Sequence, residues 1–140
     1  MPGRYFLDTN ILVYSFDKSD PRKQALAQDL IRSALANDGC LSWQVVQEFC
    51  NVALGKMKVA FSADQLESYQ KLVLVPLCRL YPDARLFGEA LQVARATGYS
   101  WYDSLVIASA QRLGCATLYS EDLQHGQVLA GGLEIRNPFL

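Results

Sequence analysis

The sequence predicts an α/β fold, a three-layer α/β/α sandwich with a short central parallel sheet. Short apolar segments alternate along the chain with segments of ten or more residues that have helical periodicity. About half of the 140 residues are hydrophobic and 19% are charged, which is typical of an ordered domain with its own core. No internal repeat, low-complexity tract or linker interrupts the sequence, so we expect a single domain over residues 1–140.

The N-terminal elements are predicted from one apolar segment and two capping residues. Tyr5–Leu7 is a short apolar segment typical of a buried strand, and a short helical turn is expected after it at 11–16. Asp20 and Pro21 are typical of a helix N-cap and of the first helical position. A helix is therefore expected to begin there and to continue to Ala36, with apolar residues at helical spacing.

Capping signals also predict the later helices. Ser62 and Gln65 resemble a capping box, and Gly98 and Gly114 are placed to end two further helices. After the first helix we expect a strand at 40–42, a helix at 43–55, a helix from 62 to about 73, a brief strand at 75–77, helices at 83–98 and 100–114, and strands at 115–120 and 133–135.

The composition excludes several classes of function. The net charge is −1 without a long block of like charge, so any nucleic-acid contact must come from local patches. The N-terminus lacks a secretory-signal pattern, and no apolar segment approaches the ~18 residues of a membrane span. We therefore expect no membrane association. The four cysteines form no C-x-x-C pair, which indicates reduced core thiols in a cytoplasmic protein. A single histidine, His125, excludes a nuclease with paired histidines and disfavours a zinc site.

Two acids directly follow predicted strands. Asp8 comes after the first strand, so it is expected in the crevice beyond the carboxyl edge of the sheet, although it would also suit a turn that caps the next helix. Glu121 and Asp122 follow the strand at 115–120. Asp122 is favoured for the crevice because side chains alternate along a strand, which places it on the same side as Ser120.

Two further acids lie on predicted helices. Glu48 is at the border of the apolar stripe of the helix at 43–55, where it either faces the crevice or extends to solvent. Asp103 occupies the third position of the helix after Ser100, as in a capping box. That helix is apolar around most of its circumference, so the Asp103 carboxylate is expected to face protein.

The four acids together predict a divalent-cation site. Grouped carboxylates repel one another unless a cation neutralises them, and oxygen-only ligands favour Mg²⁺ or Mn²⁺, one or two ions. Such ions promote phosphodiester hydrolysis by polarising the phosphate and activating water. Asp8 and Asp103 are the first choice as direct ligands, and Glu48 and Asp122 are expected to bind directly or through water. The predicted supporting residues are Thr9, Asn10, Ser42 and Ser120.

Four motifs follow one another along the chain: "FLDTNILVY", "QEFCN" after a strand that ends in serine, "GYSWYDSLVIASA" and "LYSEDLQHG". Together and in this order they resemble the PIN-domain nucleases, most closely the VapC-like toxins of type II toxin–antitoxin systems. The resemblance implies a metal-dependent endoribonuclease that cuts tRNA or ribosomal RNA, is inhibited by a small antitoxin protein and forms a homodimer. It places the acidic site on Asp8, Glu48, Asp103 and Asp122, with Ser120 in support.

The residues that contact RNA are harder to predict. The basic candidates are Lys18, Arg22, Lys23, Lys56 and Lys58, each of which also suits a solvated helix face. Aromatic residues next to the acidic motifs are suited to stacking on bases, and they are Tyr14, Trp43, Trp101 and Tyr102.

Two alternative functions are retained. One is a PIN-like module that binds RNA or protein without catalysis. The other is a phosphatase with Asp8 as the phosphorylated nucleophile, which is disfavoured because Asn10 stands where such enzymes have a second aspartate.

Overall fold

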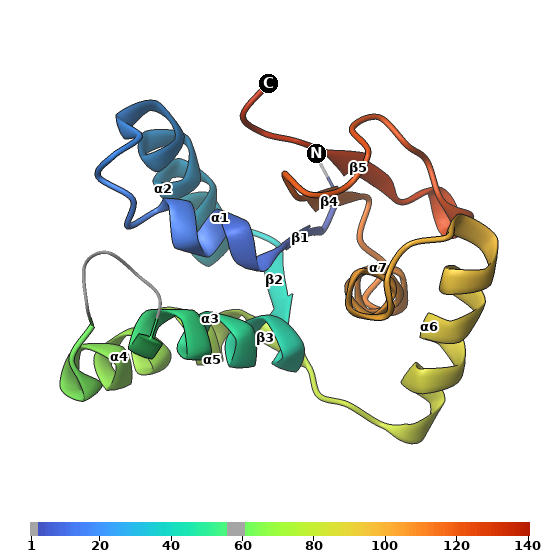
Figure 1. Cartoon of the computed structure of the whole chain (residues 1–140), viewed down its shortest axis with the longest axis horizontal. Helices are drawn as coiled ribbons and strands as arrows, with labels where there is room; N and C mark the ends of the chain where they lie inside the picture. The colour runs from blue at the N-terminus through green and yellow to red at the C-terminus, as the bar shows by residue number, and fades with distance from the viewer. Residues whose placement is uncertain (1–2, 56–60) are drawn as a thin grey trace.

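A five-stranded parallel sheet organises the chain in a computed structural model that describes residues 3–55 and 61–140. The strand order is β3-β2-β1-β4-β5, and every neighbouring pair runs parallel. The predicted α/β class is therefore confirmed (Figure 1). The strands are β1 (Tyr5–Leu7), β2 (Gly39–Ser42), β3 (Cys78–Leu80), β4 (Thr117–Tyr119) and β5 (Glu134–Arg136).

Helices cover both faces of this sheet. In Figure 1, α1 to α5 lie on one side of the strands, and α6 and α7 lie on the other. No helix among the described residues is long and apolar enough to cross a membrane. The helices are α1 (Thr9–Tyr14), α2 (Pro21–Ala36), α3 (Trp43–Gly55), α4 (Ala63–Tyr69), the π-helix η1 (Gln70–Leu74), α5 (Val75–Leu77), α6 (Ala84–Thr97), α7 (Trp101–Arg112) and the 3₁₀ helix η2 (Ala130–Gly132).

The predicted capping residues perform their expected roles. The Asp20 side chain accepts a hydrogen bond from the backbone N–H of Lys23 at the start of α2. Ser62 and Gln65 form a reciprocal capping box on α4. Gly98 ends α6 with a φ of 77°, a left-handed conformation that glycine adopts without a steric penalty.

The prediction of a brief strand at 75–77 is wrong, because these residues form helix α5. The helical segment that begins with α4 continues through η1 into α5, and the strand β3 follows at 78–80. The buried positions explain the difference. Leu74 and Leu77 are buried whereas Val75 is exposed, and a spacing of three is helical rather than the alternation of a half-buried strand.

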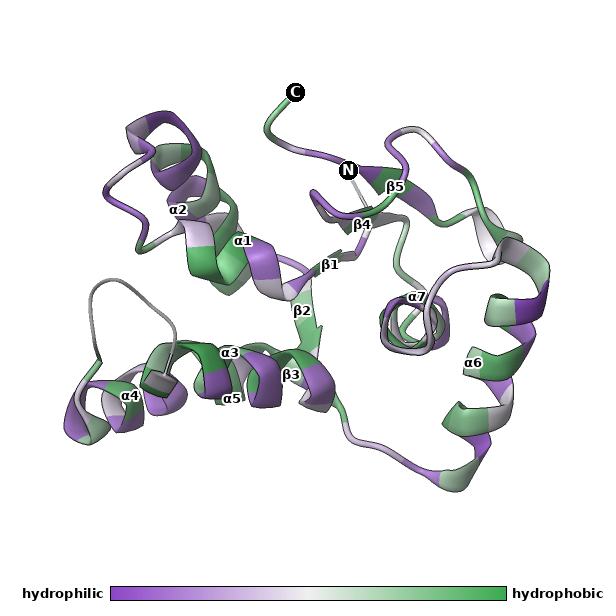
Figure 2. Ribbon diagram, in the orientation of Figure 1, coloured by the Kyte–Doolittle hydropathy of each residue, from purple (hydrophilic) through white to green (hydrophobic). Residues whose placement is uncertain are grey.

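The central strands are buried on both faces. Phe6 and Leu7 of β1 and Leu41 of β2 have no exposed surface, as expected for a parallel sheet between helices. Figure 2 shows a hydrophobic β2 at the centre of the molecule, whereas α1, α2 and α6 each carry both hydrophobic and hydrophilic residues. The deeply buried helix α7 includes Ile107, which is also fully inaccessible.

Strand order fixes where a ligand site is expected. The chain passes from β1 to β2 and β3 on one side, and it later adds β4 and β5 on the other side of β1. Ligands of open parallel sheets bind beyond the carboxyl ends of the strands where the order reverses. That position is the end of β1, directly before Asp8.

Candidate active site

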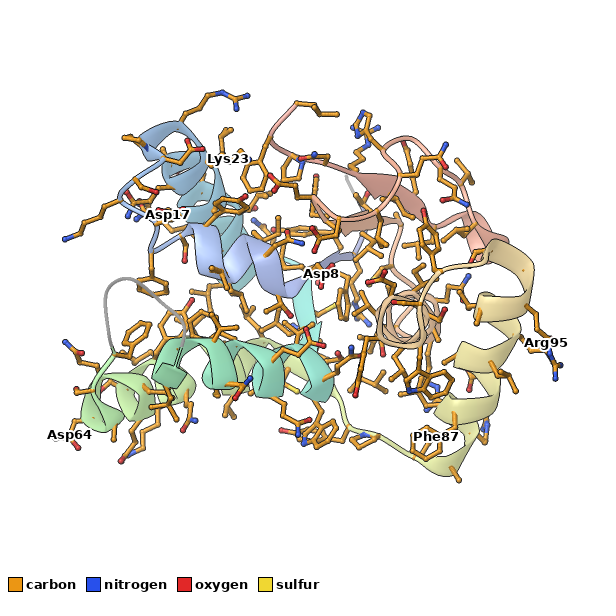
Figure 3. The ribbon with its side chains drawn as sticks, viewed as in Figure 1. Asp8, Asp17, Lys23, Asp64, Phe87 and Arg95 are labelled. Carbon is orange, nitrogen blue, oxygen red and sulfur yellow. The ribbon has the colours of Figure 1, made fainter. Side chains whose placement is uncertain are left out.

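Asp8 is the buried acid at the end of β1. Its backbone N–H donates to the carbonyl of Tyr119, which extends the β1–β4 ladder by one residue, and its side chain caps α1. Asp8 Oδ1 accepts from the Thr9 N–H at 2.7 Å, and Oδ2 accepts from Ser120 Oγ at 2.7 Å. The residue is only 6% exposed. In Figure 3 it lies near the centre of the molecule, whereas Asp64 lies at the periphery.

Burial makes the Asp8 carboxylate energetically unfavourable. Desolvation raises the pKa of Asp8 to about 6, against the opposing effect of hydrogen bonds from Ser120 and Thr9. The negative charges of Glu48 and Asp122 raise this pKa further. The structure therefore brings three of the four predicted acids close enough to interact electrostatically.

Thr9 connects Asp8 to Glu48. The Thr9 N–H donates to Asp8, while Thr9 Oγ1 donates to Glu48 Oε2 at 2.8 Å. Gln44, one helical turn before Glu48 on α3, donates from Nε2 to Glu48 Oε1 at 2.7 Å. Glu48 therefore faces the end of β1 rather than extending to solvent.

Asn10 and Ser120 hold Asp122. Asn10 Nδ2 donates to Asp122 Oδ2 at 3.1 Å and to Ser120 Oγ at 3.3 Å. The Asp122 N–H also donates to Ser120 Oγ, at 3.2 Å. Since Ser120 Oγ donates to Asp8, one hydroxyl joins the Asp8 carboxylate to the backbone of Asp122, and Asn10 joins that hydroxyl to the Asp122 carboxylate.

Glu121 is directed away from this cluster. Lys23 Nζ lies 2.6 Å from Glu121 Oε2, and Tyr14 donates its hydroxyl hydrogen to Glu121 Oε1 at 2.6 Å. Burial raises the pKa of Glu121, but the hydrogen bonds from Lys23 and Tyr14 outweigh burial and hold that pKa below its usual value. The geometry therefore favours Asp122 over Glu121 as the site acid, as the strand alternation predicts.

The helix that carries Asp103 contacts the site, but the Asp103 carboxylate itself makes no hydrogen bond to the other acids among the described residues. Its N–H donates to Ser100 Oγ at 3.2 Å, the predicted capping contact at the start of α7. The carbonyl of the preceding residue, Tyr102, accepts from Gln44 Nε2 at 3.2 Å, and the same nitrogen binds Glu48.

The predicted RNA-contacting residues have mixed environments. Lys18 is exposed, whereas Arg22 donates to the carbonyl of Phe139 at 2.7 Å and Lys23 is paired with Glu121. Neither of these intramolecular contacts follows from the local sequence around Arg22 or Lys23. Lys56 and Lys58 lie outside the described residues.

Ser42 does not support the carboxylates as predicted. Its hydroxyl is buried and has no hydrogen-bond partner among residues 3–55 and 61–140. Over the same residues, no group of three or more His, Cys, Asp or Glu side chains is close enough to hold a metal ion by itself.

Fold and site together define a parallel α/β domain with carboxylates at its topological switch point. The model of the PIN domain matches residues 5–128, so the chain belongs to the PIN-domain family. The expected family is thereby confirmed. No curated protein matches the chain significantly.

Solved structures of toxins from toxin–antitoxin pairs share this fold. FitAcB from Neisseria gonorrhoeae is 22% identical over 96% of this chain and 98% of its own, with a TM-score of 0.64. A toxin–antitoxin complex from Klebsiella pneumoniae is 17% identical over 96% and 97%, with a TM-score of 0.69. VapC20 from Mycobacterium tuberculosis, described as a sarcin-ricin loop cleaving toxin, is 19% identical over 81% and 86%, with a TM-score of 0.58.

Proposed function

We propose that this protein is a Mg²⁺- or Mn²⁺-dependent endoribonuclease and the toxin of a toxin–antitoxin pair. The observation that carries the proposal is the buried Asp8 carboxylate, which is linked through Thr9 to Glu48 and through Ser120 to Asp122. Membership of the PIN-domain family supports a nuclease, and the toxins with the same fold support the biological role.

The residues around Asp8 suit a divalent cation. None of the ion pairs among the described residues involves Asp8, so its negative charge is buried without a basic partner. Each Asp8 oxygen accepts one hydrogen bond from the described residues, which leaves lone pairs for a hard cation. Asp8 and Asp103 would hold the ion directly, with Glu48 and Asp122 bound directly or through water.

The bound ion would polarise the scissile phosphate and lower the pKa of a water molecule. The protein's own residues fix the geometry around it. Thr9 holds Asp8 and Glu48 at a set separation by donating to both, and Asn10 orients Asp122. Above pH 6 most Asp8 side chains are ionised and can bind a cation.

Cleavage of RNA by the purified protein tests the activity. We expect cleavage with Mg²⁺, none with EDTA, and a loss in Asp8→Asn, while Asp29→Asn retains activity because Asp29 is an exposed acid on α2. Cleavage that persists both in EDTA and in Asp8→Asn would reject the metal mechanism. Absence of cleavage of any RNA would favour a PIN-like module that only binds RNA or protein.

The phosphatase alternative requires Asp8 to act as an accessible nucleophile. Its 6% exposure and the hydrogen bonds on both oxygens do not favour that role. Phosphate release from a general phosphatase substrate, abolished in Asp8→Asn, would nevertheless establish it.

The toxin role is tested in cells. We expect expression to slow growth, and a small antitoxin protein encoded beside this chain to relieve the effect. Mapping of new RNA 5′ ends after brief expression, compared with Asp8→Asn, would identify the RNA and the bond that is cut. We also propose a homodimer, which the resemblance to VapC-like toxins implies, and the size of the purified protein in solution tests it. Harmless expression of folded wild-type protein would contradict the toxin role.

A further inference from the structure

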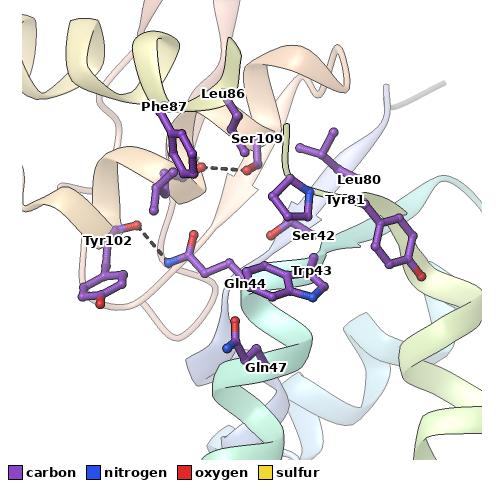
Figure 4. Close-up of a pocket in the computed structure, with 12 residues that line it drawn as sticks. Ser42, Trp43, Gln44, Gln47, Leu80, Tyr81, Leu86, Phe87, Tyr102 and Ser109 are labelled. Atoms are coloured by element: carbon purple, nitrogen blue, oxygen red, sulfur yellow. Dashed lines mark hydrogen bonds between the residues drawn. The ribbon is translucent and has the colours of Figure 1, made fainter. Parts of the chain in front are cut away.

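Gln44 joins the two helices that carry Glu48 and Asp103. It is the second residue of α3, and its Nε2 atom donates to Glu48 Oε1 at 2.7 Å and to the backbone carbonyl of Tyr102 at 3.2 Å. Tyr102 lies in the first turn of α7, directly before Asp103, and Figure 4 shows the Gln44 amide directed at its carbonyl. Over residues 3–55 and 61–140, the bond to Tyr102 is the only hydrogen bond between α3 and α7.

The two helices lie on opposite faces of the sheet, as Figure 1 shows. They are not closely packed near this bond, because an apolar cavity of about 100 Å³ lies between α3, α6 and α7 and is bordered by Trp43, Phe87 and Leu105. Where side chains do not fill the space between two helices, packing fixes their separation less strictly. The hydrogen bond from Gln44 therefore has more influence on where the first turn of α7 lies.

The Asp103 carboxylate depends on that turn for its position. No hydrogen bond from the described residues reaches this carboxylate, so none of their side chains orients it in that way. The Ser100 hydroxyl accepts from the Asp103 N–H, but this contact lies within the cap of α7 and does not place the turn relative to Glu48. The bond from Gln44 to Tyr102 does, and the same nitrogen holds Glu48.

We propose that Gln44 is a positioning residue, which holds Glu48 and Asp103 at the separation that a shared divalent cation requires. The proposal rests on the metal-dependent nuclease function proposed above. Thr9 already joins Asp8 to the other oxygen of Glu48. Gln44 extends this path of hydrogen bonds to the backbone of the residue before Asp103. Acids at the end of β1, on α3 and on α7 are thereby held in one arrangement.

A glutamine amide suits this bridge. Its nitrogen has two hydrogens, one for each acceptor, and it carries no charge. A hydroxyl group would supply only one hydrogen, and a lysine ammonium group would neutralise Glu48 and repel the cation. Because a carboxylate and a backbone carbonyl only accept hydrogen bonds, both bonds come from the nitrogen, and the buried Gln44 Oε1 has no partner among the described residues.

The bond is not needed to satisfy the Tyr102 carbonyl. In an α-helix the carbonyl of each residue accepts from the N–H four residues later, so α7 itself supplies a partner for this carbonyl. A carbonyl oxygen has a second lone pair, and Gln44 uses it. What the bond adds is a fixed separation between two helices that each carry an acid of the site.

Titration calorimetry of Mn²⁺ without RNA tests the proposal on the intact chain. Gln44→Met keeps the length of the side chain, removes both donated bonds and brings no unpaired polar atom of its own, so the fold should persist. We expect this variant to bind Mn²⁺ about tenfold more weakly than wild type, because residues that orient metal ligands typically contribute at least that much. The matched control is Gln47→Met, which changes an exposed residue of α3 that makes no hydrogen bond to other described residues and should leave the affinity unchanged.

Two further variants separate positioning from a general loss of structure, with circular dichroism of the metal-free proteins as the check on folding. Gln44→Asn keeps the amide but is one methylene shorter, so it is too short for both acceptors and should also weaken Mn²⁺ binding; wild-type affinity in this variant would count against the bridge. In an Asp103→Asn background, Gln44→Met should weaken binding only about threefold, because one of the two acids that it positions is already absent. A full tenfold loss in that background would show that Gln44 acts independently of Asp103 and would overturn the proposal.

The outcomes also separate this proposal from the nuclease proposal. Equal Mn²⁺ affinity in Gln44→Met and wild type would overturn the positioning role, and cleavage of RNA by wild type would then still support the nuclease. Weaker Mn²⁺ binding in Gln44→Met, without cleavage of any RNA by wild type, would support the positioning role and reject the nuclease. Absence of Mn²⁺ binding by wild type would reject both.

Discussion

Replacement of Asp8 by asparagine should stabilise the metal-free protein at high pH. The pKa of Asp8 in the fold is about 6, whereas the ordinary value is 3.8. A carboxyl group with a raised pKa binds protons more tightly in the folded state, so the free energy of unfolding falls as the pH rises from about 4 to about 6. The difference corresponds to roughly 3 kcal/mol that wild type loses over this range.

The asparagine side chain avoids the ionisation but loses one hydrogen bond. Ser120 Oγ already accepts from Asn10 Nδ2 and from the Asp122 N–H, so it accommodates a third donor poorly. That loss is worth about 1 kcal/mol. We therefore expect Asp8→Asn to be about 2 kcal/mol more stable than wild type at pH 8, and about 1 kcal/mol less stable at pH 4, where Asp8 is largely protonated.

Urea unfolding at pH 4, 6 and 8 in EDTA measures the difference in unfolding free energy between Asp8→Asn and wild type, which should change sign between pH 4 and pH 8. Asp29→Asn is the control, because an exposed carboxylate paired with Arg32 should change stability by less than ~0.5 kcal/mol at every pH. A pH-independent difference between Asp8→Asn and wild type would refute the conclusion that burial destabilises the Asp8 carboxylate.

Three further substitutions test other parts of the structure. Glu48→Gln should reduce RNA cleavage by about 100-fold or more while the circular dichroism spectrum stays native, because one charge near Asp8 is lost. Lys23→Met should release Glu121 and lower the cleavage rate at saturating metal about tenfold, because the loop that carries Asp122 then loses its anchor. An unchanged rate would show that the ion pair does not position Asp122. Gly39→Ala should lower the urea unfolding free energy by about 1–3 kcal/mol, because its Cβ would overlap Ala34 of α2, and equal stability would show that α2 shifts freely.

The parallel sheet and the position of Asp8 at the end of β1 were predictable because both follow from local signals. An apolar segment that ends in Asp8, before a helix, places a carboxylate beyond a parallel strand in any α/β fold. Alternation along the strand also predicts Asp122 beside Ser120. The strand β4 ends at Tyr119, however, and the two residues meet because the Asp122 backbone N–H donates to Ser120 Oγ in the segment after it.

Contacts between distant segments were not predictable in the same way. The ion pair between Lys23 and Glu121 joins residues that are 98 positions apart in the sequence, and no local sequence pattern predicts it. Such a contact depends on how α2 packs beside the end of β4. From the local sequence Lys23 is therefore a candidate for RNA contact, whereas in the structure its ammonium group pairs with the carboxylate of Glu121.

Ser42 shows a different limit of sequence reasoning. A serine at the end of β2 is expected to support the acids, but Ser42 borders an apolar cavity instead, and its hydroxyl is buried without a hydrogen-bond partner among the described residues. A shift of a strand end by one residue changes the side of the sheet on which its last side chain lies. The register between β2 and β3 shifts between Leu41 and Ser42, and this irregularity is not readable from composition or spacing.

Calorimetric titration of Mn²⁺ into the purified protein at pH 7.5, without RNA, tests most directly whether the acids converge on a divalent ion. The account predicts saturable binding of one or two ions per chain, weakened at least about tenfold in Asp8→Asn and unchanged in Asp29→Asn. Binding of equal strength in Asp8→Asn, or no binding by wild type at millimolar Mn²⁺, would contradict it.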